Sequence, residues 1–190
     1  MRPLHFLILA ASFLLAASAP TSAQERVRGP LIQRTTLIVT DIDKSVDFYQ
    51  RIGLVKASDI LTTEKDEGGV YGAAALPLTA DSKNSRMVVM RGADERAGAI
   101  GLLWYDRPQL PSARGNLAGV GTGDVIVSIE VADAQGAASR LNQIGTRFHV
   151  PLGRFSAKGA DGTTQTGQHM IAYDPDGHVV EIVQGDAAKR

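Results

Sequence analysis

An internal repeat limits the possible folds of this chain more than any other feature of its sequence. The segment RTTLIVTDIDKSVDFYQRIG (34–53) aligns without a gap with IVSIEVADAQGAASRLNQIG (126–145), at an offset of 92 residues. Four positions are identical, and the apolar residues also recur at matching places. The identical pairs are Val39 with Val131, Asp41 with Asp133, and Ile52-Gly53 with Ile144-Gly145. Two copies of one structural unit are therefore predicted.

Each copy has the pattern of a strand followed by a helix. The runs Thr35–Thr40 and Asp124–Val131 are rich in β-forming residues. Asp41 or Asp43 can cap the first helix, and Asp133 the second. Apolar residues at helical spacing predict one buried face on each helix. They are Ile42, Val46, Tyr49 and Ile52 in the first copy, and Ala134, Ala137, Ala138, Leu141 and Ile144 in the second. Gly53 and Gly145 stand where each helix is expected to end.

Three further strands are expected after each helix. They are Leu54–Thr62, Ser85–Arg91 and Ala99–Tyr105 in the first half, and Arg147–Val150, Gln168–Tyr173 and His178–Gln184 in the second. Residues 106–123 are rich in Pro, Gly and small polar residues and predict a linker, while 63–84 and 159–168 predict long loops. The predicted fold class is α+β, with two βαβββ modules over residues 34–105 and 124–185.

The first 23 residues have the features of a secretory signal peptide. Arg2 precedes an apolar run from about Phe6 to Ala17, and small residues lead to an expected cleavage after Ala23. An uncleaved membrane anchor is the alternative. Residues 24–33 and 186–190 are expected to be short tails. The chain has no cysteine, which excludes disulfides and lipid attachment at a processed cysteine. A secreted or periplasmic protein is the expectation.

The charge balance bears on the class of partner. Without the leader, which carries only Arg2, 19 Lys and Arg remain against 20 Asp and Glu. This balance shows neither a nucleic-acid footprint nor a polybasic patch for membranes, so we expect no nucleic-acid partner and no membrane contact after cleavage. A small-molecule ligand remains open.

Two motifs resemble a known superfamily. TTLIVTDIDKSVDFYQRIGL, with its D-x-x-x-S-x-x-F-Y signature, and the terminal DPDGHVVEIVQ (174–184) are similar to the vicinal oxygen chelate superfamily, which includes glyoxalase I, bleomycin-resistance proteins and extradiol dioxygenases. The signature residues are Asp41, Ser45, Phe48 and Tyr49. The resemblance covers residues 33–185. It implies a curled mixed sheet around a cleft and a homodimer, but the motifs themselves have a structural role and do not say which member this is.

The resemblance also implies four metal-ligand positions, at Arg34, Gly101, Ile126 and Glu181. Family members usually have His, Glu or Gln, His and Glu there. A guanidinium has no lone pair for a metal, and glycine and isoleucine have no ligating side chain. One carboxylate does not make a divalent site. No metal or other cofactor is therefore expected, unless His149 and His169 rebuild a site with Glu181.

Glu181 is the acidic residue among these four positions, which we call the inherited positions. Strand alternation places it on one face with Val179 and Val183. A tight DPDG hairpin would put Met170 across from Glu181 and turn His169 away. Two interpretations stay open: an ion pair with Arg34 across the cleft, or a carboxylate that faces water. The ligand-binding candidates are Arg34, Glu181, Trp104 and Met170, and Glu181 is also a weak candidate for a catalytic base.

Three functional hypotheses follow. The first is an exported protein that binds a small molecule in its cleft without a metal. The second is a glyoxalase-like lyase or isomerase, or a dioxygenase, with a rebuilt metal site or acid–base chemistry by Glu181. The third is a structural role in an exported dimer. The resemblance favours the first, because three of the four ligand positions cannot bind a metal.

Overall fold

The computed structural model describes residues 30–71, 76, 81–94, 97–106, 120–159 and 161–186. The chain divides into two units, 1–31 and 32–190, and the fold described below belongs to the second. The expected signal peptide and most of the expected linker lie outside the described residues. Among the described residues, no helix is long and apolar enough to cross a membrane.

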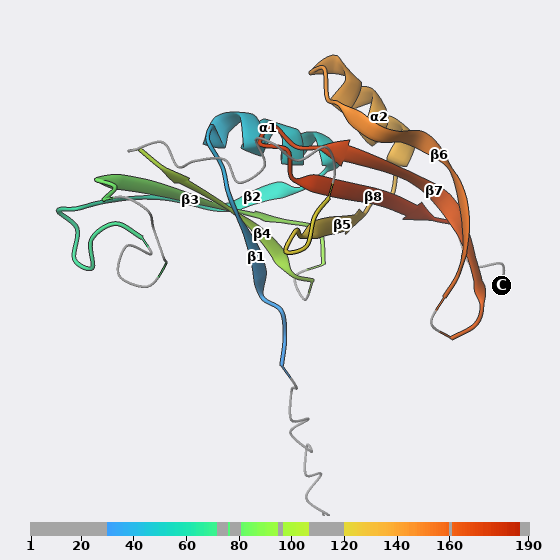
Figure 1. Ribbon diagram of the computed structural model, residues 1–190, viewed down its shortest axis with the longest axis horizontal. Coiled ribbons are helices and arrows are strands. Elements are labelled where there is room, and N and C mark those ends of the chain that lie inside the picture. The colour runs from blue at the N-terminus through green and yellow to red at the C-terminus, as the bar shows by residue number, and fades with distance from the viewer. Residues whose placement is uncertain are drawn as a thin grey trace, which may run out of the picture. The chain divides into compact units, whose positions relative to one another are not determined.

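The first module contains β1 (Arg34–Ile38), α1 (Ile42–Ile52), β2 (Val55–Thr63), β3 (Asn84–Arg91) and β4 (Ala99–Tyr105). The second contains β5 (Ile126–Glu130), α2 (Ala134–Gln143), β6 (Phe148–Lys158), β7 (Thr164–Tyr173) and β8 (Val179–Gly185). Their sheets have the equivalent orders β1-β4-β3-β2 and β5-β8-β7-β6 (Figure 1). In each sheet the first strand runs parallel to the last, and the other neighbours are antiparallel. Both sheets are curled and open, which confirms the predicted α+β class with two βαβββ modules.

The helices begin at the predicted capping residues. The Asp41 side chain accepts a hydrogen bond from the backbone N–H of Lys44, and that of Asp133 accepts one from Gly136. Each bond satisfies a donor that has no partner within its own helix. Helix α1 ends at Gly53, whose φ of 121° is a backbone conformation that L side chains rarely adopt. Asp41 rather than Asp43 is thus the cap of α1, and Asp43 lies in the first turn.

Strands β6 and β7 are longer than predicted. β6 continues to Lys158 instead of ending at Val150, and β7 begins at Thr164 instead of Gln168. Two register shifts in the β6–β7 ladder, between Phe148 and Val150 and between Val150 and Gly153, carry the strand past Pro151 and Gly153. Much of the loop predicted at 159–168 is therefore strand.

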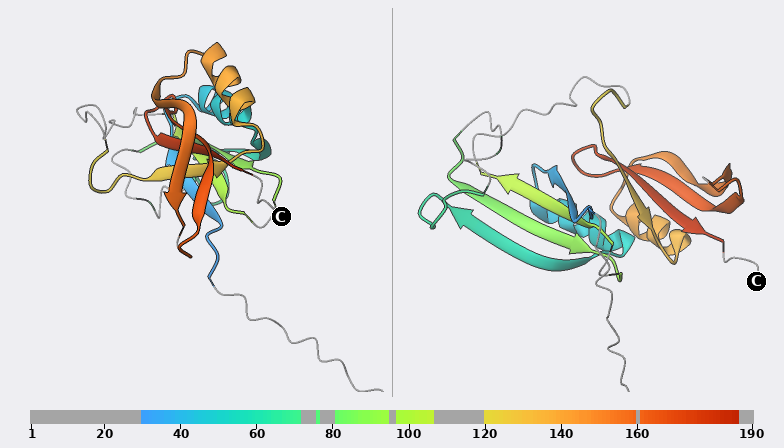
Figure 2. Two further views of the ribbon diagram at one scale, coloured as in Figure 1. Left: turned by 90° about the vertical axis from the view of Figure 1, so that its right-hand side faces the viewer. Right: turned by 90° about the horizontal axis from the view of Figure 1, so that it is seen from below.

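One hydrophobic core joins the two modules within the chain. It contains apolar residues of both helices and of the sheet faces behind them, including Leu37, Tyr49, Leu102, Leu141, Met170 and Ile182. Figure 2 shows α1 and α2 as neighbours. Near their ends, Arg51 donates to the backbone carbonyl of Arg140, and Arg140 donates to that of Arg51, at 3.3 Å and 2.8 Å. Because the helices cover one face of each sheet, the opposite faces remain for a binding site.

Candidate functional site

The helix-free face of the first sheet, meaning the face opposite α1, has its own apolar cluster. Val70, from the segment after β2, packs there with Met87, Leu103 and Tyr105. The next residue is also fixed to the sheet: the backbone N–H of Tyr71 lies 3.0 Å from both Thr62 Oγ1 and Ser85 Oγ. The Tyr105 hydroxyl donates to the Tyr71 carbonyl at 2.9 Å. This part of the long predicted loop therefore covers the sheet.

Arg34 lies on the same face at the edge strand β1. Its Nε donates to Thr36 Oγ1 and its Nη2 to the Tyr71 hydroxyl, both at 3.0 Å. The guanidinium is thus fixed by two neutral hydroxyl groups. No acidic side chain of the described residues forms an ion pair with it. Of the two interpretations of Glu181, the ion pair with Arg34 is not formed, because Arg34 binds Thr36 and Tyr71 of its own module.

Gly101 gives the Arg34 side chain its room. The two residues lie on neighbouring strands, with Gly101 paired to Thr36. A Cβ atom on Gly101 would lie 2.8 Å from Arg34 Cδ, 3.0 Å from Thr36 Oγ1 and 3.1 Å from Arg34 Nε. A metal-ligating side chain at position 101 would collide with Arg34 in this conformation. The residues at these two inherited positions therefore do not fit a divalent metal.

Glu181 lies on the helix-free face of the second sheet. One of its carboxylate oxygens accepts a hydrogen bond of 2.9 Å from the Ser128 hydroxyl on the neighbouring strand β5. Ile126, the remaining inherited position, is 55% exposed on the same strand. A groove of about 370 Å³ brings Ile126 and Ser128 together with Thr35 of β1 and Ala99 of β4. Of the four inherited positions, this groove is lined by Ile126, whereas Arg34, Gly101 and Glu181 lie outside its lining.

The register of the last hairpin differs from the prediction by one residue. Ile171 is the partner of Glu181, and Met170 is the partner of Ile182. The pair next to the turn is Tyr173 with Val179, so the turn is one residue longer than in the predicted tight hairpin. Every side chain of β7 therefore points to the face opposite to the predicted one. The expected register of Met170 was therefore wrong: Met170 is fully buried in the core on the helix side.

The same register moves His169. It is paired with Val183, so it lies on the face of Glu181 rather than turning away as predicted. Its ring packs against Phe155, while His149 contacts the ring of Tyr173. No three His, Asp or Glu side chains among the described residues come together in a group that could hold a metal. His149 and His169 thus have aromatic neighbours of their own.

Trp104, a ligand-binding candidate, lies on the helix side of the first sheet. It is paired with Arg86 and packs against the main core beside α1. Strand β4 is almost entirely buried, so its sequence AIGLLWY carries no alternation that would tell one face from the other. Trp104 is therefore not at the helix-free face, where Leu103 and Tyr105 of the same strand lie.

Sequence reasoning missed Tyr71 and Ser128. Tyr71 is 37 positions from Arg34 in the chain, within a segment predicted only as a loop, and no local pattern indicates the contact. Ser128 could have been found, because parallel pairing of β5 with β8 places it directly beside Glu181. The Tyr71 hydroxyl binds Arg34, and the Ser128 hydroxyl binds Glu181.

A larger cavity lies on the other side of the molecule. It has a volume of about 760 Å³ between α1 and the β7–β8 turn, and Phe48, Arg147, Asp174 and Asp176 help to line it. Its turn carboxylates are already bound: Asp174 accepts from Tyr49 and His178, and Asp176 from Thr40 and Ser45. These bonds support the fold, so we place the candidate site at the helix-free faces.

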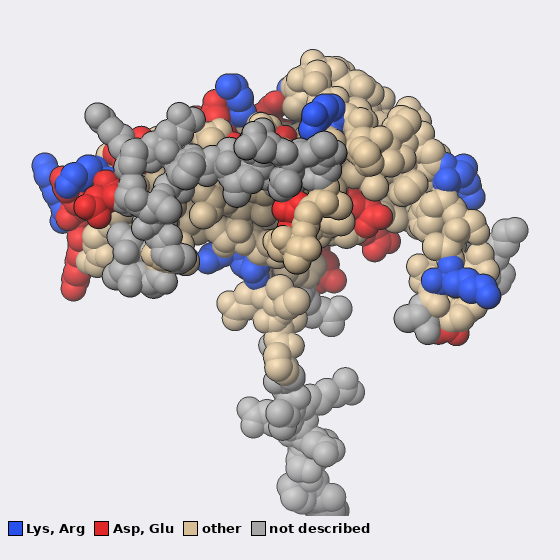
Figure 3. Space-filling model, viewed as in Figure 1, with Lys and Arg blue, Asp and Glu red and all other residues tan. Residues whose placement is uncertain are grey.

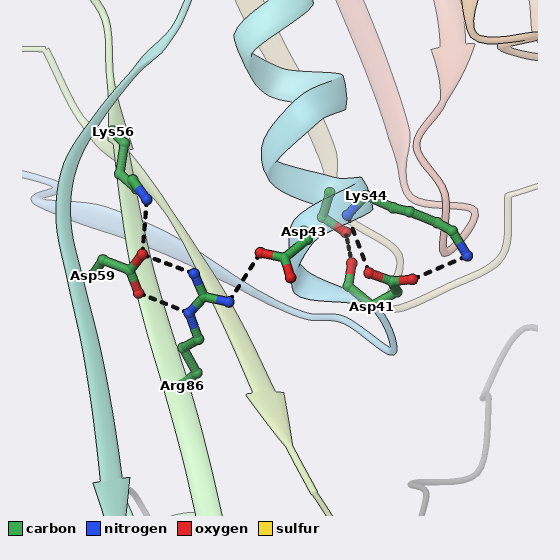
Figure 4. Close-up of polar contacts among 7 residues, drawn as sticks. Asp41, Asp43, Lys44, Lys56, Asp59 and Arg86 are labelled. Carbon is green, nitrogen blue, oxygen red and sulfur yellow. Dashed lines mark hydrogen bonds and ion pairs between the residues drawn. The ribbon is translucent and has the colours of Figure 1, made fainter.

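A charged cluster at the N-terminal end of α1 has a structural role. Arg86 on β3 forms two hydrogen bonds of 2.8 Å to Asp59 on β2 and one of 2.9 Å to Asp43 on α1, while Lys56 also binds Asp59 (Figure 4). Hydrogen bonds from Arg86, and then from Lys56, lower the pKa of Asp59 far below its usual range. On the face in Figure 3, described acidic and basic side chains are interspersed.

The fold and the sequence motifs agree with one family model. The model of the Glyoxalase/Bleomycin resistance protein/Dioxygenase superfamily matches residues 31–182. The chain belongs to this superfamily. The two modules, the signature on α1 and the DPDG turn are thus features of a shared glyoxalase-type domain.

Solved structures show the same fold. A glyoxalase family protein from Bacillus cereus has a TM-score of 0.63 and 14% identity, over 87% of this chain and 100% of that one. SMU.1112c has a TM-score of 0.51 and 16% identity, over 82% and 99%. TnmS3, an antibiotic binding protein from Streptomyces sp. CB03234, is more distant, with a TM-score of 0.45 and 15% identity over 84% and 98%. A comparison with curated proteins finds no significant relative. At these identities the likeness extends to the fold alone.

Proposed function

We propose that this glyoxalase-type protein is exported and binds a small molecule at its helix-free faces without a divalent metal. The main support for the proposal is the position of the Arg34 side chain over Gly101, because it occupies the space that a ligating side chain at position 101 would need. Ile126 adds an aliphatic side chain at a third inherited position. Glu181 supplies the one carboxylate of the set, and one carboxylate does not hold a divalent ion.

A homodimer is part of the proposal. Several apolar side chains on the open strands remain exposed in the single chain, among them Ile38, Ile60 and Ile126. These residues lie on the edge strands β1, β2 and β5, and exposed apolar residues on edge strands can be covered by a partner chain. A second copy of the chain would bury part of this surface and narrow the access to the groove beside β5. Sedimentation of the purified chain is expected to show a dimer, and a monomer at micromolar concentration would contradict it.

Export is the third part of the proposal, supported by the leader sequence alone. The full chain expressed in a Gram-negative host is expected in the periplasmic fraction, with an N-terminus at Gln24. Intact-mass measurement of the purified protein gives the cleavage site directly. A full-length product in the membrane fraction would instead support the uncleaved anchor.

The metal-free part of the proposal has a direct test. The full-length gene is expressed, and the purified product is loaded separately with Zn, Ni, Mn and Fe(II), dialysed and analysed for bound metal. Less than about 0.1 metal per chain is expected for each ion, because the inherited positions supply a single ligating side chain. A stoichiometric metal that is lost in Glu181→Ala would contradict the proposal and support a glyoxalase or dioxygenase with a rebuilt site.

Ligand binding is tested separately from metal binding. The metal-free protein is screened by thermal unfolding against a library of small aromatic and apolar metabolites. A compound that binds the native state and not the unfolded chain raises the unfolding temperature, and the stabilisation grows with the logarithm of its concentration above Kd. At least one compound is expected to do so. Absence of any stabilisation across the library would favour the purely structural role.

A further inference from the structure

The Arg34 guanidinium is a fixed cation with unused hydrogen-bonding capacity. It has five N–H donors, and the two bonds to Thr36 and Tyr71 use two of them. Both partners are neutral hydroxyl groups, and no described acidic residue forms an ion pair with Arg34. By contrast, Arg86 forms ion pairs with Asp59 and Asp43. Arg154 forms one with Asp186. Arg34 is therefore restrained in position, and its charge is not compensated by an acidic side chain of the described residues.

Gly101 leaves the space that the Arg34 side chain occupies. The Arg34 chain passes so close to β4 that Cδ and Nε would be within 2.8 Å and 3.1 Å of any Cβ on Gly101. The Arg34 side chain thus adopts this position only because residue 101 has no side chain.

The surroundings of Arg34 define the kind of ligand that fits. Ile38, four residues further along β1 and on the same face beyond Thr36, is 45% exposed. The Tyr71 side chain is partly exposed and offers a hydroxyl group beside the guanidinium. A guanidinium binds a carboxylate through two parallel N–H···O bonds, and neighbouring apolar and aromatic groups accommodate an apolar body. A molecule with a carboxylate on an aromatic or aliphatic frame matches this combination.

We propose that Arg34, seated over Gly101 and held by Thr36 and Tyr71, binds the carboxylate of an apolar small-molecule ligand. The guanidinium then takes the place of the metal as the positive centre that holds two neighbouring oxygens of the ligand. This inference rests on the proposed function, because it names the ligand class of the same metal-free site. It assigns Arg34 as the principal determinant of affinity and Gly101 as a positioning residue.

Matched pairs of probes test the proposal. Benzoate, 2-naphthoate and 4-biphenylcarboxylate are each titrated into the full-length gene product by calorimetry, alongside the corresponding carboxamides. In the wild-type protein at least one carboxylate is expected to bind about 10- to 100-fold more tightly than its amide, the range for hydrogen bonds to a charged group. Arg34→Gln is expected to remove this preference, and Arg34→Lys to restore part of it, because an ammonium keeps the charge but not the planar pair of donors.

A second set of variants separates positioning from general damage. Gly101→Ala is expected to weaken carboxylate binding by displacing Arg34, with little effect on the amide. Gly185→Ala is the matched glycine control, since a Cβ there meets nothing within 4 Å. Arg154→Gln is the matched charge control, since Arg154 binds Asp186 elsewhere on the surface. Thermal unfolding of each variant shows that it is folded before titration.

The outcomes distinguish the two proposals. Equal binding of carboxylate and amide, unchanged by Arg34→Gln, would overturn the inference about Arg34 and leave metal-free binding of an apolar ligand in place. Failure of every probe to bind the wild-type protein would count against both. Loss of carboxylate preference in the two control variants as well as in Arg34→Gln would also overturn the assignment, because the effect would then not depend on the seat over Gly101.

Discussion

The hydroxyl of Tyr49 donates a hydrogen bond of 3.3 Å to Oδ2 of Asp174, and this bond joins the helix of the first module to the turn of the second. Both residues are buried. Three further bonds link the same parts of the chain: the backbone N–H and the hydroxyl of Thr40 and the hydroxyl of Ser45 all donate to the carboxylate of Asp176. The signature on α1 and the DPDG turn, which lie more than a hundred residues apart, are therefore partners in one interface. Their role is to fix the modules to each other.

Loss of the Tyr49 hydroxyl is expected to destabilise the fold. Tyr49→Phe keeps the packed ring but removes the donor to Asp174, and we expect a loss of about 1–2 kcal/mol in the free energy of unfolding. Urea denaturation followed by circular dichroism measures it. Tyr173→Phe is the control, because the Tyr173 ring stacks under Arg147 while its hydroxyl makes no hydrogen bond to a described residue. Equal effects of the two variants would contradict the role of the bond.

The same residue predicts a loss of stability at alkaline pH. Burial, and then the negative charge of Asp174, raise the pKa of Tyr49 well above its usual value of 10.0. The folded state thus favours the neutral phenol, and its advantage is complete below pH 10. Above pH 10 only the unfolded chain ionises, so the free energy of unfolding falls by up to about 1.4 kcal/mol per pH unit from this residue.

The comparison with Tyr49→Phe isolates that effect from other alkaline groups. The difference in unfolding free energy between wild type and variant is expected to be constant from pH 7 to 9 and to shrink above pH 10. Parallel urea titrations at each pH give the difference. A difference that stays constant up to pH 11 would show that Tyr49 ionises as readily in the folded state as in the unfolded chain.

Asp59 predicts the opposite dependence, at acid pH. Hydrogen bonds from Arg86, and then Lys56, hold the pKa of this carboxyl far below its usual value of 3.8. Its contribution to stability is present above pH 3.8 and is lost as the pH falls toward the lower folded pKa. Asp59→Asn is therefore expected to cost about 1 kcal/mol at pH 7, and the wild-type and variant curves should converge below pH 3.8.

Urea titrations of the two proteins between pH 7 and 2.5 measure this convergence. Glu130→Gln serves as the control at pH 7, since Glu130 is exposed on β5 and its carboxylate accepts no hydrogen bond from a described residue. We expect it to leave the denaturation midpoint unchanged. A constant gap between wild type and Asp59→Asn down to pH 2.5 would mean that packing, not charge, causes the difference.

The arrangement of elements could be predicted from local signals, whereas the binding face depended on long-range ones. The repeat, the caps at Asp41 and Asp133 and the stop at Gly53 each depend on a few neighbouring residues, and all appear in the structure. The face of Met170 depended on one residue in the length of a turn. A hairpin of either length fits the sequence DPDG, because proline and glycine suit turns of several lengths.

Two other failures have physical causes of their own. Strand β4 is buried on both faces, so no alternation marks the side of Trp104. Tyr71 reaches Arg34 only because the segment after β2 folds back over the sheet, through bonds to Thr62 and Ser85. Contacts of this kind depend on the tertiary structure and leave no periodic pattern in the sequence.

The glycine pair Gly167 and Gly185 gives a stringent test of the β7–β8 ladder, which carries Glu181. The two residues face each other in register, yet their surroundings differ. A Cβ on Gly167 would lie 2.1 Å from the Gln184 carbonyl oxygen and 2.8 Å from the Phe155 ring, whereas a Cβ on Gly185 meets nothing within 4 Å. Gly167→Ala is therefore expected to cost about 2 kcal/mol or more, because backbone must move to admit the methyl group.

Gly185→Ala should change stability by less than about 0.5 kcal/mol, as is usual for surface positions. Thermal unfolding of both variants measures the difference. Because the same substitution is made at two paired positions of one ladder, helix or strand propensity does not contribute to it. Unfolding temperatures that fall equally would show that the strands are not paired in this register, and the placement of Ile171 opposite Glu181 would then be wrong as well. A large fall for Gly167→Ala alone supports the register on which the candidate site depends.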